Sequence, residues 1–199
     1  MFKKAIIIAV LLFWTLNFSM AQAPQKKKIF NGKNLNGWVV PENNIWWSAN
    51  KGVLFGKSGP ERKGTILWTE KSYKNFIIET EFLYDDGVVD TGIFLRTEKQ
   101  QIQMGISGSL KRDMTGSPYI PGKGYPVEAE GVAKILKPKT WNTIKVKAIG
   151  NVYTVWINGK QVLSYESADV PEMGPIGLQL HPGNIMEVSF RNIRIAEIK

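Results

Sequence analysis

Residues 141–164 read WNTIKVKAIGNVYTVWINGKQVLS, and this stretch decides the fold class. Apolar and polar side chains alternate on both sides of Gly150-Asn151, as they do in β-strands that bury one face. Asn158-Gly159 follows, and this dipeptide favours a two-residue hairpin turn because both of its positions need a positive φ. The stretch therefore predicts an antiparallel β-meander.

A similar pattern extends over the chain from Phe30 onward. Short runs rich in Ile, Val, Phe, Tyr and Trp are separated by Gly, Pro, Asn and Asp, and no helical stripe competes with them. The strands expected from this pattern span residues 45–49, 53–55, 65–68, 76–84, 91–97, 100–106, 141–149, 152–157, 161–164, 174–181 and 185–195. Many short strands with few helices predict an all-β fold, a two-sheet antiparallel β-sandwich.

Residues 107–138 interrupt the strand pattern, because glycines and prolines recur too often for any long element. The sequence therefore predicts a long inserted loop within the domain. Loops of this length in compact domains are often binding elements or lids, and a surface excursion without a function is the alternative.

The N-terminus has the order of a secretory signal. Two lysines precede an apolar run, residues 5–13, and small residues follow it. A retained membrane anchor is the alternative, but an uninterrupted span needs roughly 20 apolar residues. We expect a signal peptide over 1–21 with cleavage before Gln22, a flexible leader over 22–28, and a single domain over 29–199. The mature chain is then periplasmic or secreted, without a membrane partner.

The amino-acid composition excludes several kinds of partner and catalytic site. Lys and Arg number 26 against 17 Asp and Glu, yet the charges are scattered and only Lys26-Lys27-Lys28 forms a run, so we expect no nucleic-acid partner. The chain has no cysteine, which excludes disulfides and thiol chemistry. One histidine, His181, excludes a multi-histidine zinc site, so any divalent metal would have oxygen ligands. No cofactor is evident.

Four of the expected strands carry a polar face, since alternate side chains of a strand point to opposite sides. If the strands are neighbours, these side chains gather on one sheet surface. They are Glu79, Glu81, Arg96, Gln101, Gln103, Gln179 and His181. Amides and arginine make directional hydrogen bonds to hydroxyls, so this surface predicts a carbohydrate ligand. An ordinary solvated face is the alternative.

Aromatic side chains and carboxylates add to the carbohydrate interpretation. Sugar rings stack on aromatic faces, and Trp46, Trp47, Tyr119 and Tyr125 are the expected surface candidates. Carboxylates are the natural acid and base in a chain without cysteine. Glu79 and Glu81 stand two apart on one strand face, roughly 7 Å between Cβ atoms. That spacing suits paired carboxylate catalysis or a structural ion pair with Arg96.

Five stretches, in this order, resemble the 3-keto-disaccharide hydrolase family. They are FNGKNLNGW at 30–38, FIIETEF at 76–82, TGIFLR at 91–96, GLQLH at 177–181 and VSFRNI at 188–193. The resemblance implies a concanavalin A-like lectin/glucanase sandwich, a jelly roll. Two departures stand out: the family often has Glu-x-Gln where this chain has Gln101-Ile102-Gln103, and Asp90-Thr91-Gly92 replaces the usual Asn-Ser-Gly.

The resemblance implies substrates whose glucose unit is oxidised at C3. The ketone acidifies the C2 hydrogen, so a base can start an elimination that water converts into net hydrolysis. On this basis Glu81 is expected as base or acid, Arg96 as anchor or enolate stabiliser, and His181 as second proton carrier. The expected substrate contacts are Glu79, Gln101, Gln103, Lys111, Asp113, Tyr119, Lys123, Tyr125 and Gln179. An upstream sugar oxidoreductase would supply the ketone.

Two other functions fit the same residues. A retaining glycanase on this fold needs two carboxylates about 5 Å apart, and Glu79-x-Glu81 with Asp85 is a loose match to such a set. A noncatalytic carbohydrate-binding module needs the amides and aromatic rings but no carboxylate.

Overall fold

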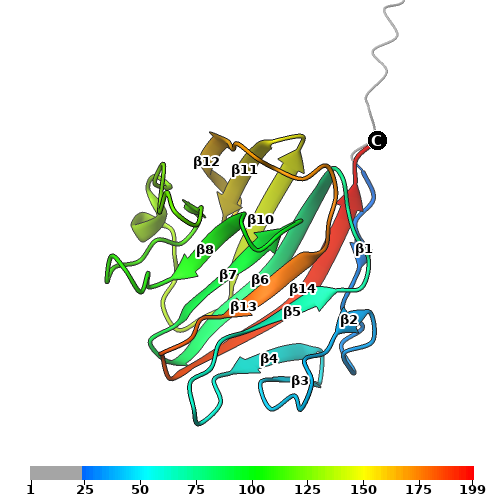
Figure 1. Cartoon of the computed structure of the whole chain (residues 1–199), viewed down its shortest axis with the longest axis vertical. Coiled ribbons are helices and arrows are strands. Elements are labelled where there is room, and N and C mark those ends of the chain that lie inside the picture. The colour runs from blue at the N-terminus through cyan, green and yellow to red at the C-terminus, as the bar shows by residue number, and fades with distance from the viewer. Residues whose placement is uncertain (1–23) are drawn as a thin grey trace, which may run out of the picture.

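Strand β6 (Phe76–Gly87) runs through the middle of the larger of two sheets, and its alternating side chains define the two sides of that sheet. Phe76, Ile78, Thr80 and Phe82 are fully buried, whereas Ile77, Glu79 and Glu81 are partly exposed. The computed structural model describes residues 24–199 and shows two antiparallel sheets packed as a sandwich (Figure 1). The all-β sandwich predicted from the sequence is confirmed.

The larger sheet has eight strands. Their order is β12 (Lys160–Glu166), β11 (Val152–Ile157), β10 (Asn142–Ile149), β6, β14 (Met186–Glu197), β4 (Val53–Lys57) and β3 (Trp47–Asn50), and β1 (Lys27–Lys28) pairs with β14. The predicted hairpin turn is present between β11 and β12, where Asn158 and Gly159 both have positive φ.

The smaller sheet has six strands and lies in front of the larger one in Figure 1. Their order is β2 (Trp38–Val39), β5 (Thr65–Thr69), β13 (Ile176–Leu180), β7 (Asp90–Leu95), β8 (Gln101–Gly105) and β9 (Pro118–Tyr119). Strand β7 pairs with β8, which follows it in sequence, and with β13, which comes much later in the chain, so the three strands lie side by side. These three strands form the floor of the site described below.

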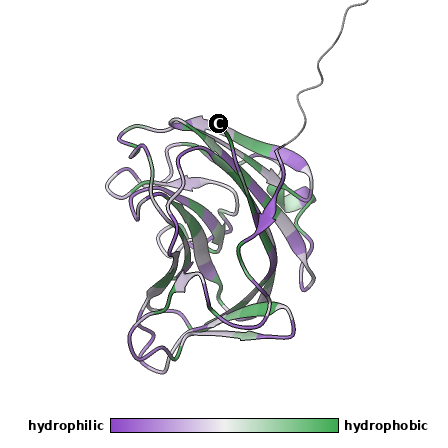
Figure 2. Ribbon diagram, turned by 90° about the vertical axis from the view of Figure 1, so that its right-hand side faces the viewer, coloured by the Kyte–Doolittle hydropathy of each residue, from purple (hydrophilic) through white to green (hydrophobic). Residues whose placement is uncertain are grey.

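The core lies between the sheets, which Figure 2 shows edge-on as two curved layers. Ile93, Ile102 and Leu178 of the smaller sheet are at most 1% exposed and face the buried residues of β6 and β10. Each such side chain contributes about 1.5–3 kcal/mol when it leaves water. Because this burial takes one side of each strand, the other side of the smaller sheet is available for a ligand.

The N-terminal segment differs from expectation in one respect. Lys27 and Lys28, expected in a flexible leader, pair with Ile195 and Arg194 of β14, because the last strand otherwise has an open edge there. The predicted signal peptide lies outside the described residues. Within residues 24–199, no helix has the length and apolarity needed to cross a membrane.

Residues 107–138 carry β9 and one 3-10 turn, η1 (Val132–Lys134). The segment is tied to the sandwich at Thr115, whose hydroxyl accepts a hydrogen bond from the Gly105 amide (2.8 Å) and lies 2.9 Å from the hydroxyl of Tyr84. Burial raises the pKa of Tyr84, which therefore keeps its proton. This anchor holds the following residues, Tyr119 among them, over the outer side of the smaller sheet.

Arg96 directly follows β7, and its φ of 66° ends the strand. The side chain therefore leaves the alternation that it would share with Phe94, and it is 4% exposed. Its Nε and Nη1 donate hydrogen bonds to the carbonyl oxygens of Lys74 and Gly150, each at 2.7 Å. Arg96 thus joins the end of β7 to the start of β6 and to the β10–β11 turn, and it does not line the cavity described below, where the expected role as anchor or enolate stabiliser would require it.

We expect Arg96→Met to lower the free energy of unfolding by about 2 kcal/mol, because two carbonyl oxygens lose their donors. Urea denaturation measures the change. Lys160→Met, which removes an exposed cation from β12, is the matched control and should change stability by less than about 0.5 kcal/mol. Equal stability of the two variants would contradict the structural role of Arg96.

Candidate functional site

Side chains of three neighbouring strands form rows across the outer side of the smaller sheet. Phe94 of β7 lies opposite Gln101 of β8, and two residues earlier Gly92 lies opposite Gln103. At the start of β7, the carbonyl of Asp90 accepts a hydrogen bond from the His181 amide at 3.2 Å. Successive rows therefore lead along β7 from an aromatic end at Phe94 to an ionisable end at Asp90 and His181.

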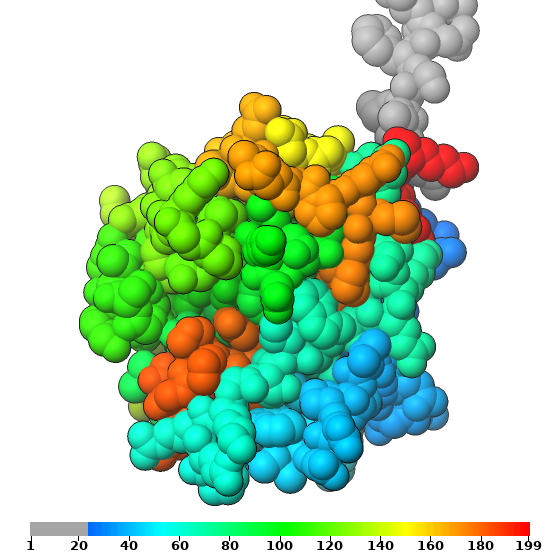
Figure 3. All heavy atoms as spheres, viewed as in Figure 1, coloured from blue at the N-terminus to red at the C-terminus, as the bar shows by residue number. Residues whose placement is uncertain are grey.

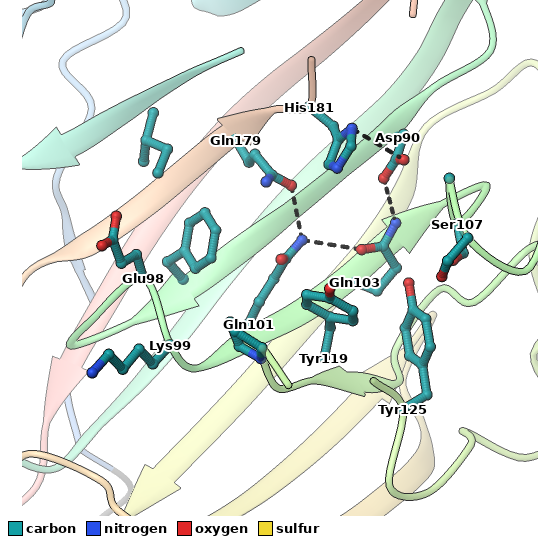
Figure 4. Close-up of a pocket in the computed structure, with 15 residues that line it drawn as sticks. Asp90, Glu98, Lys99, Gln101, Gln103, Ser107, Tyr119, Tyr125, Gln179 and His181 are labelled. Carbon is teal, nitrogen blue, oxygen red and sulfur yellow. Dashed lines mark hydrogen bonds and ion pairs between the residues drawn. The ribbon is translucent and has the colours of Figure 1, made fainter. Parts of the chain in front are cut away.

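A cavity of about 690 Å³ covers these rows. In the space-filling view, segments from the end of β13 (orange to red), the β8–β9 region (green) and the β4–β5 region (cyan) meet on this side of the molecule (Figure 3). The lining residues are Ile66, Asp90, Phe94, Glu98, Lys99, Gln101, Gln103, Ser107, Gly108, Ser109, Tyr119, Pro121, Tyr125, Gln179 and His181. Figure 4 shows their arrangement.

A chain of side-chain amides crosses the cavity floor (Figure 4). The Gln101 amide nitrogen donates hydrogen bonds to the side-chain oxygens of Gln103 (3.0 Å) and Gln179 (2.9 Å). The Gln103 amide nitrogen donates to Oδ1 of Asp90 at 2.7 Å. An amide nitrogen has two hydrogens, so both donors of Gln101 are used within the protein. The chain fixes which atoms of these amides face a ligand.

The Asp90 carboxylate is 2% exposed, and its Oδ2 has no hydrogen-bond partner within residues 24–199. Nδ1 of His181 lies 3.6 Å from this oxygen, which is ion-pair range but too long for a hydrogen bond. Nδ1 also lies 2.8 Å from the carbonyl oxygen of Pro182. Because a carbonyl only accepts, Nδ1 carries the hydrogen and Nε2 has a free lone pair. His181 can therefore take a proton from a ligand.

Two tyrosines from the 107–138 segment line the cavity, and Tyr125 is the one near Asp90. The rings of Tyr119 and Tyr125 are 5.2 Å apart between centroids. Burial raises the pKa of Tyr125, the nearby Asp90 charge raises it further, and the Ser107 hydroxyl acts in the opposite direction. Tyr125 is therefore a protonated phenol at neutral pH and can donate a hydrogen bond.

The structure brings six of the residues expected from the sequence into this cavity: Gln101, Gln103, Tyr119, Tyr125, Gln179 and His181. Asp90, Phe94 and Ser107 also line it, and sequence reasoning did not select them. Alternation along β7 could have indicated Asp90, since it stands four residues before Phe94 and hence on the same side of the strand.

Glu79 and Glu81 do not belong to this site, and the expectation that they share a face with the glutamines is wrong. Both lie on β6, in the larger sheet, with their side chains on its outer side, so the whole sandwich separates them from the cavity. Glu81 accepts hydrogen bonds from Arg191 Nε (2.7 Å) and Asn192 Nδ2 (2.6 Å). Glu79 is paired with Lys26 at 2.6 Å.

Glu81 is held as an ionised carboxylate by these partners. Partial burial alone would raise its pKa, but the hydrogen bonds from Asn192 and Arg191 and the Arg191 charge outweigh burial and lower it. The guanidinium of Arg191 also lies 4.1 Å from the centroid of the Trp141 ring. Glu81 therefore has a structural partner and does not act on a ligand in the cavity, contrary to the role expected for it.

Three expected contacts from the inserted segment also lie outside the cavity lining. Lys111 and Lys123 are exposed on the surface, and Asp113 accepts a hydrogen bond from the Thr115 amide at 2.8 Å within its own turn. Trp46 and Trp47, expected at the surface, pack against the core. Across residues 24–199, no three His, Asp or Glu side chains gather closely enough to hold a metal ion.

A comparison of the sequence with known families gives a match over most of the chain. Residues 25–196 match the 3-keto-alpha-glucoside-1,2-lyase-like domain. The chain belongs to this family. The family resemblance inferred from the five short stretches is thereby confirmed.

Solved structures with the same fold include members of several carbohydrate-related groups. Two candidate glycosyl hydrolases from Parabacteroides distasonis superpose with TM-scores of 0.68 and 0.66 at 18% and 24% identity. Each covers 87% of this chain, and the match spans 94% and 100% of theirs. The carbohydrate-binding module CBM66 from Bacillus subtilis gives 0.56 at 14% identity over 81% of this chain and 96% of its own. No curated protein sequence is matched.

Gly92 makes the amide chain possible in this family member. A Cβ at position 92 would lie 2.2 Å from Nε2 of Gln101, so Gln101 crosses β7 only because Gly92 has no side chain. We expect Gly92→Ala to lower the free energy of unfolding by about 1–3 kcal/mol, since displaced buried amides lose their partners. Adding Gln101→Ala should restore part of the loss in a double-mutant cycle, and additive effects would contradict the clash.

Glu81→Gln should change stability in a pH-dependent way. The lowered pKa of Glu81 means that its stabilisation is complete above its ordinary value of 4.5 and is lost as the pH falls through the folded-state value. At pH 7 the variant should be less stable by about 1 kcal/mol or less. The two proteins should converge below about pH 3. Urea denaturation at both pH values checks this, and a constant difference would argue against the ion pair.

Proposed function

We propose that this chain cleaves the glycosidic bond of 3-keto-glucosides in the cavity on the smaller sheet. The observation that supports this best is the buried Asp90 carboxylate beside His181, at one end of a cavity lined with amides. Family membership over residues 25–196 supports the same substrate class. A cavity of about 690 Å³ falls within the usual range for small-molecule sites, roughly 300–1,000 Å³.

The ketone at C3 makes the C2 hydrogen acidic, so proton transfer at C2 starts the reaction. His181 Nε2 takes that proton, and the electron pair delocalises onto the C3 oxygen as an enolate. Return of the pair forms the C1–C2 double bond and breaks the bond from C1 to the departing oxygen. The Tyr125 phenol, which keeps its proton, donates it to that oxygen. Water then adds at C1 and gives a proton to the Tyr125 phenolate, and the proton on His181 returns to C2, so the sum is a hydrolysis.

Asp90 acts through His181 as a positioning residue. When the imidazole takes a proton it becomes a cation, and the carboxylate 3.6 Å away stabilises that charge. The unpartnered Oδ2 of Asp90 can also accept a hydrogen bond from a sugar hydroxyl, which would satisfy a buried polar atom. Gln103 holds Oδ1, so the direction of the carboxylate is set before a ligand binds.

A retaining glycanase is less well supported. Of the lining residues, Asp90 and Glu98 carry carboxylates; Asp90 is the first residue of β7, and Glu98 lies beyond its end. Five strand steps alone separate the Cα atoms of Asp90 and Leu95 by about 17 Å. A retaining glycosidase needs about 5 Å between its two carboxyl groups.

A noncatalytic binding module is the second candidate, since the superposition with CBM66 shows that this fold serves a protein described as a carbohydrate-binding module. We also propose export of the chain and an upstream sugar oxidoreductase, because the N-terminal sequence is that of a secretory signal and the substrate must first be oxidised at C3.

Turnover assays with paired substrates test the proposal. The protein should cleave 3-keto-glucosides and leave the unoxidised glucosides intact. His181→Gln should lower kcat by about 10²- to 10⁴-fold. Asp90→Asn keeps the shape of the side chain but removes its charge, and it should lower kcat by about tenfold or more and alter the pH profile.

Glu81→Gln is the matched control, and it should retain full turnover because Glu81 lies on the other sheet. Binding of both sugar sets without cleavage would instead support the noncatalytic module. Cleavage of unoxidised glucosides at the same rate would contradict the dependence on the ketone.

A further inference from the structure

The end of the cavity that faces away from Asp90 is built on aromatic rings. Gly177 of β13 lies between Trp68 of β5 and Phe94 of β7 in the sheet. A Cβ on Gly177 would stand 2.7 Å from atoms of the Trp68 ring, so the ring occupies the space that a side chain would fill. The Trp68 and Phe94 rings meet there with centroids 5.6 Å apart. Trp68 thus supports Phe94 from outside the cavity.

Other apolar groups complete this end. Tyr119 of β9 lies opposite Gln101, in the row that contains Phe94, and Ile66 of β5 lies opposite Gln179, in the next row on the same side of the sheet. Pro121 follows from the inserted segment, and all of these residues line the cavity. We call this set, Ile66, Phe94, Tyr119 and Pro121, the apolar subsite.

Part of the hydrogen-bond capacity near the apolar subsite is used by the protein. Both amide hydrogens of Gln101 are donated to Gln103 and Gln179. Glu98 and Lys99, the charged residues beside this end, are exposed, so water satisfies them without a ligand. A planar apolar group bound against Ile66, Phe94 and Pro121 would lose its contact with water and would need no hydrogen bond.

We infer that the apolar subsite binds an aryl leaving group, so that the substrates are aryl 3-keto-glucosides. This inference rests on the proposed function, which places the keto-sugar at Asp90 and His181. The bond-breaking step is consistent with an aryl leaving group at the apolar subsite. When the C1–O bond breaks, the electron pair goes to a phenolic oxygen, whose conjugate acid has a pKa of about 10, so departure depends little on a strong acid.

The first experiment compares three substrates of the unmodified protein: phenyl 3-keto-glucoside, methyl 3-keto-glucoside and a 3-keto-disaccharide. We expect the phenyl compound to have a KM about tenfold below the other two, because an aromatic ring at the subsite adds stacking and apolar contact. Equal KM values, or a lower KM for the disaccharide, would overturn the inference.

The second experiment uses variants. Phe94→Val should reduce the preference for phenyl over methyl substrate by about tenfold, and Ile66→Thr, which keeps a β-branched residue in β5, should reduce it in the same direction. Phe55→Val is the matched control, because Phe55 lies on β4 of the other sheet, and it should keep the preference. A preference that survives Phe94→Val and Ile66→Thr would contradict the subsite.

A binding assay separates this inference from the proposed function. Unoxidised phenyl glucoside is titrated into the protein while tryptophan fluorescence is followed, with methyl glucoside as the comparison. If no 3-keto-glucoside is cleaved, the proposed function fails. The subsite is then still supported if phenyl glucoside binds more tightly than methyl glucoside and Phe94→Val removes the difference. Equal binding of the two would overturn it.

Discussion

The buried carboxylate of Asp90 is the constraint on which the cavity depends. A carboxylate that is 2% exposed has little contact with water, so protein groups must supply its hydrogen bonds. Gln103 supplies one partner, and Gln101 donates to both Gln103 and Gln179, so three amides from two strands form a chain that ends at one acid. The remaining oxygen faces His181, which makes proton transfer the most natural use of the site.

Glycine determines where these groups can lie. On the outer side of the smaller sheet, Gly92 leaves room for the Gln101 amide and Gly177 leaves room for the Trp68 ring. The space at Gly92 lets polar side chains meet, and the space at Gly177 lets aromatic side chains meet. Two missing side chains therefore divide one cavity into a polar end and an aromatic end. A sheet surface with ordinary side chains at both positions would have neither.

Local patterns in the sequence predicted the strands and the side of each strand that is buried, because alternation is a property of a single strand. They could not predict which strands share a sheet. Glu81 and Gln103 both alternate with core residues, yet β6 and β8 belong to different sheets, so the two side chains point away from each other across the sandwich. Alternation misplaced the Arg96 side chain for another reason. The positive φ of Arg96 ends the alternation one residue after Leu95, and a two-residue period does not indicate where a strand ends.

The two departures from the family pattern now have a common explanation. The resemblance leads one to expect a carboxylate at position 101 and an amide at position 90, and this chain has Gln101 and Asp90 instead. Gln103 lies between them, with its nitrogen toward Asp90 and its oxygen toward Gln101. A glutamine side chain presents a donor on one side and an acceptor on the other, so turning it over would serve the opposite arrangement equally well. In this protein the acid of the hydrogen-bonded chain stands at position 90, next to His181.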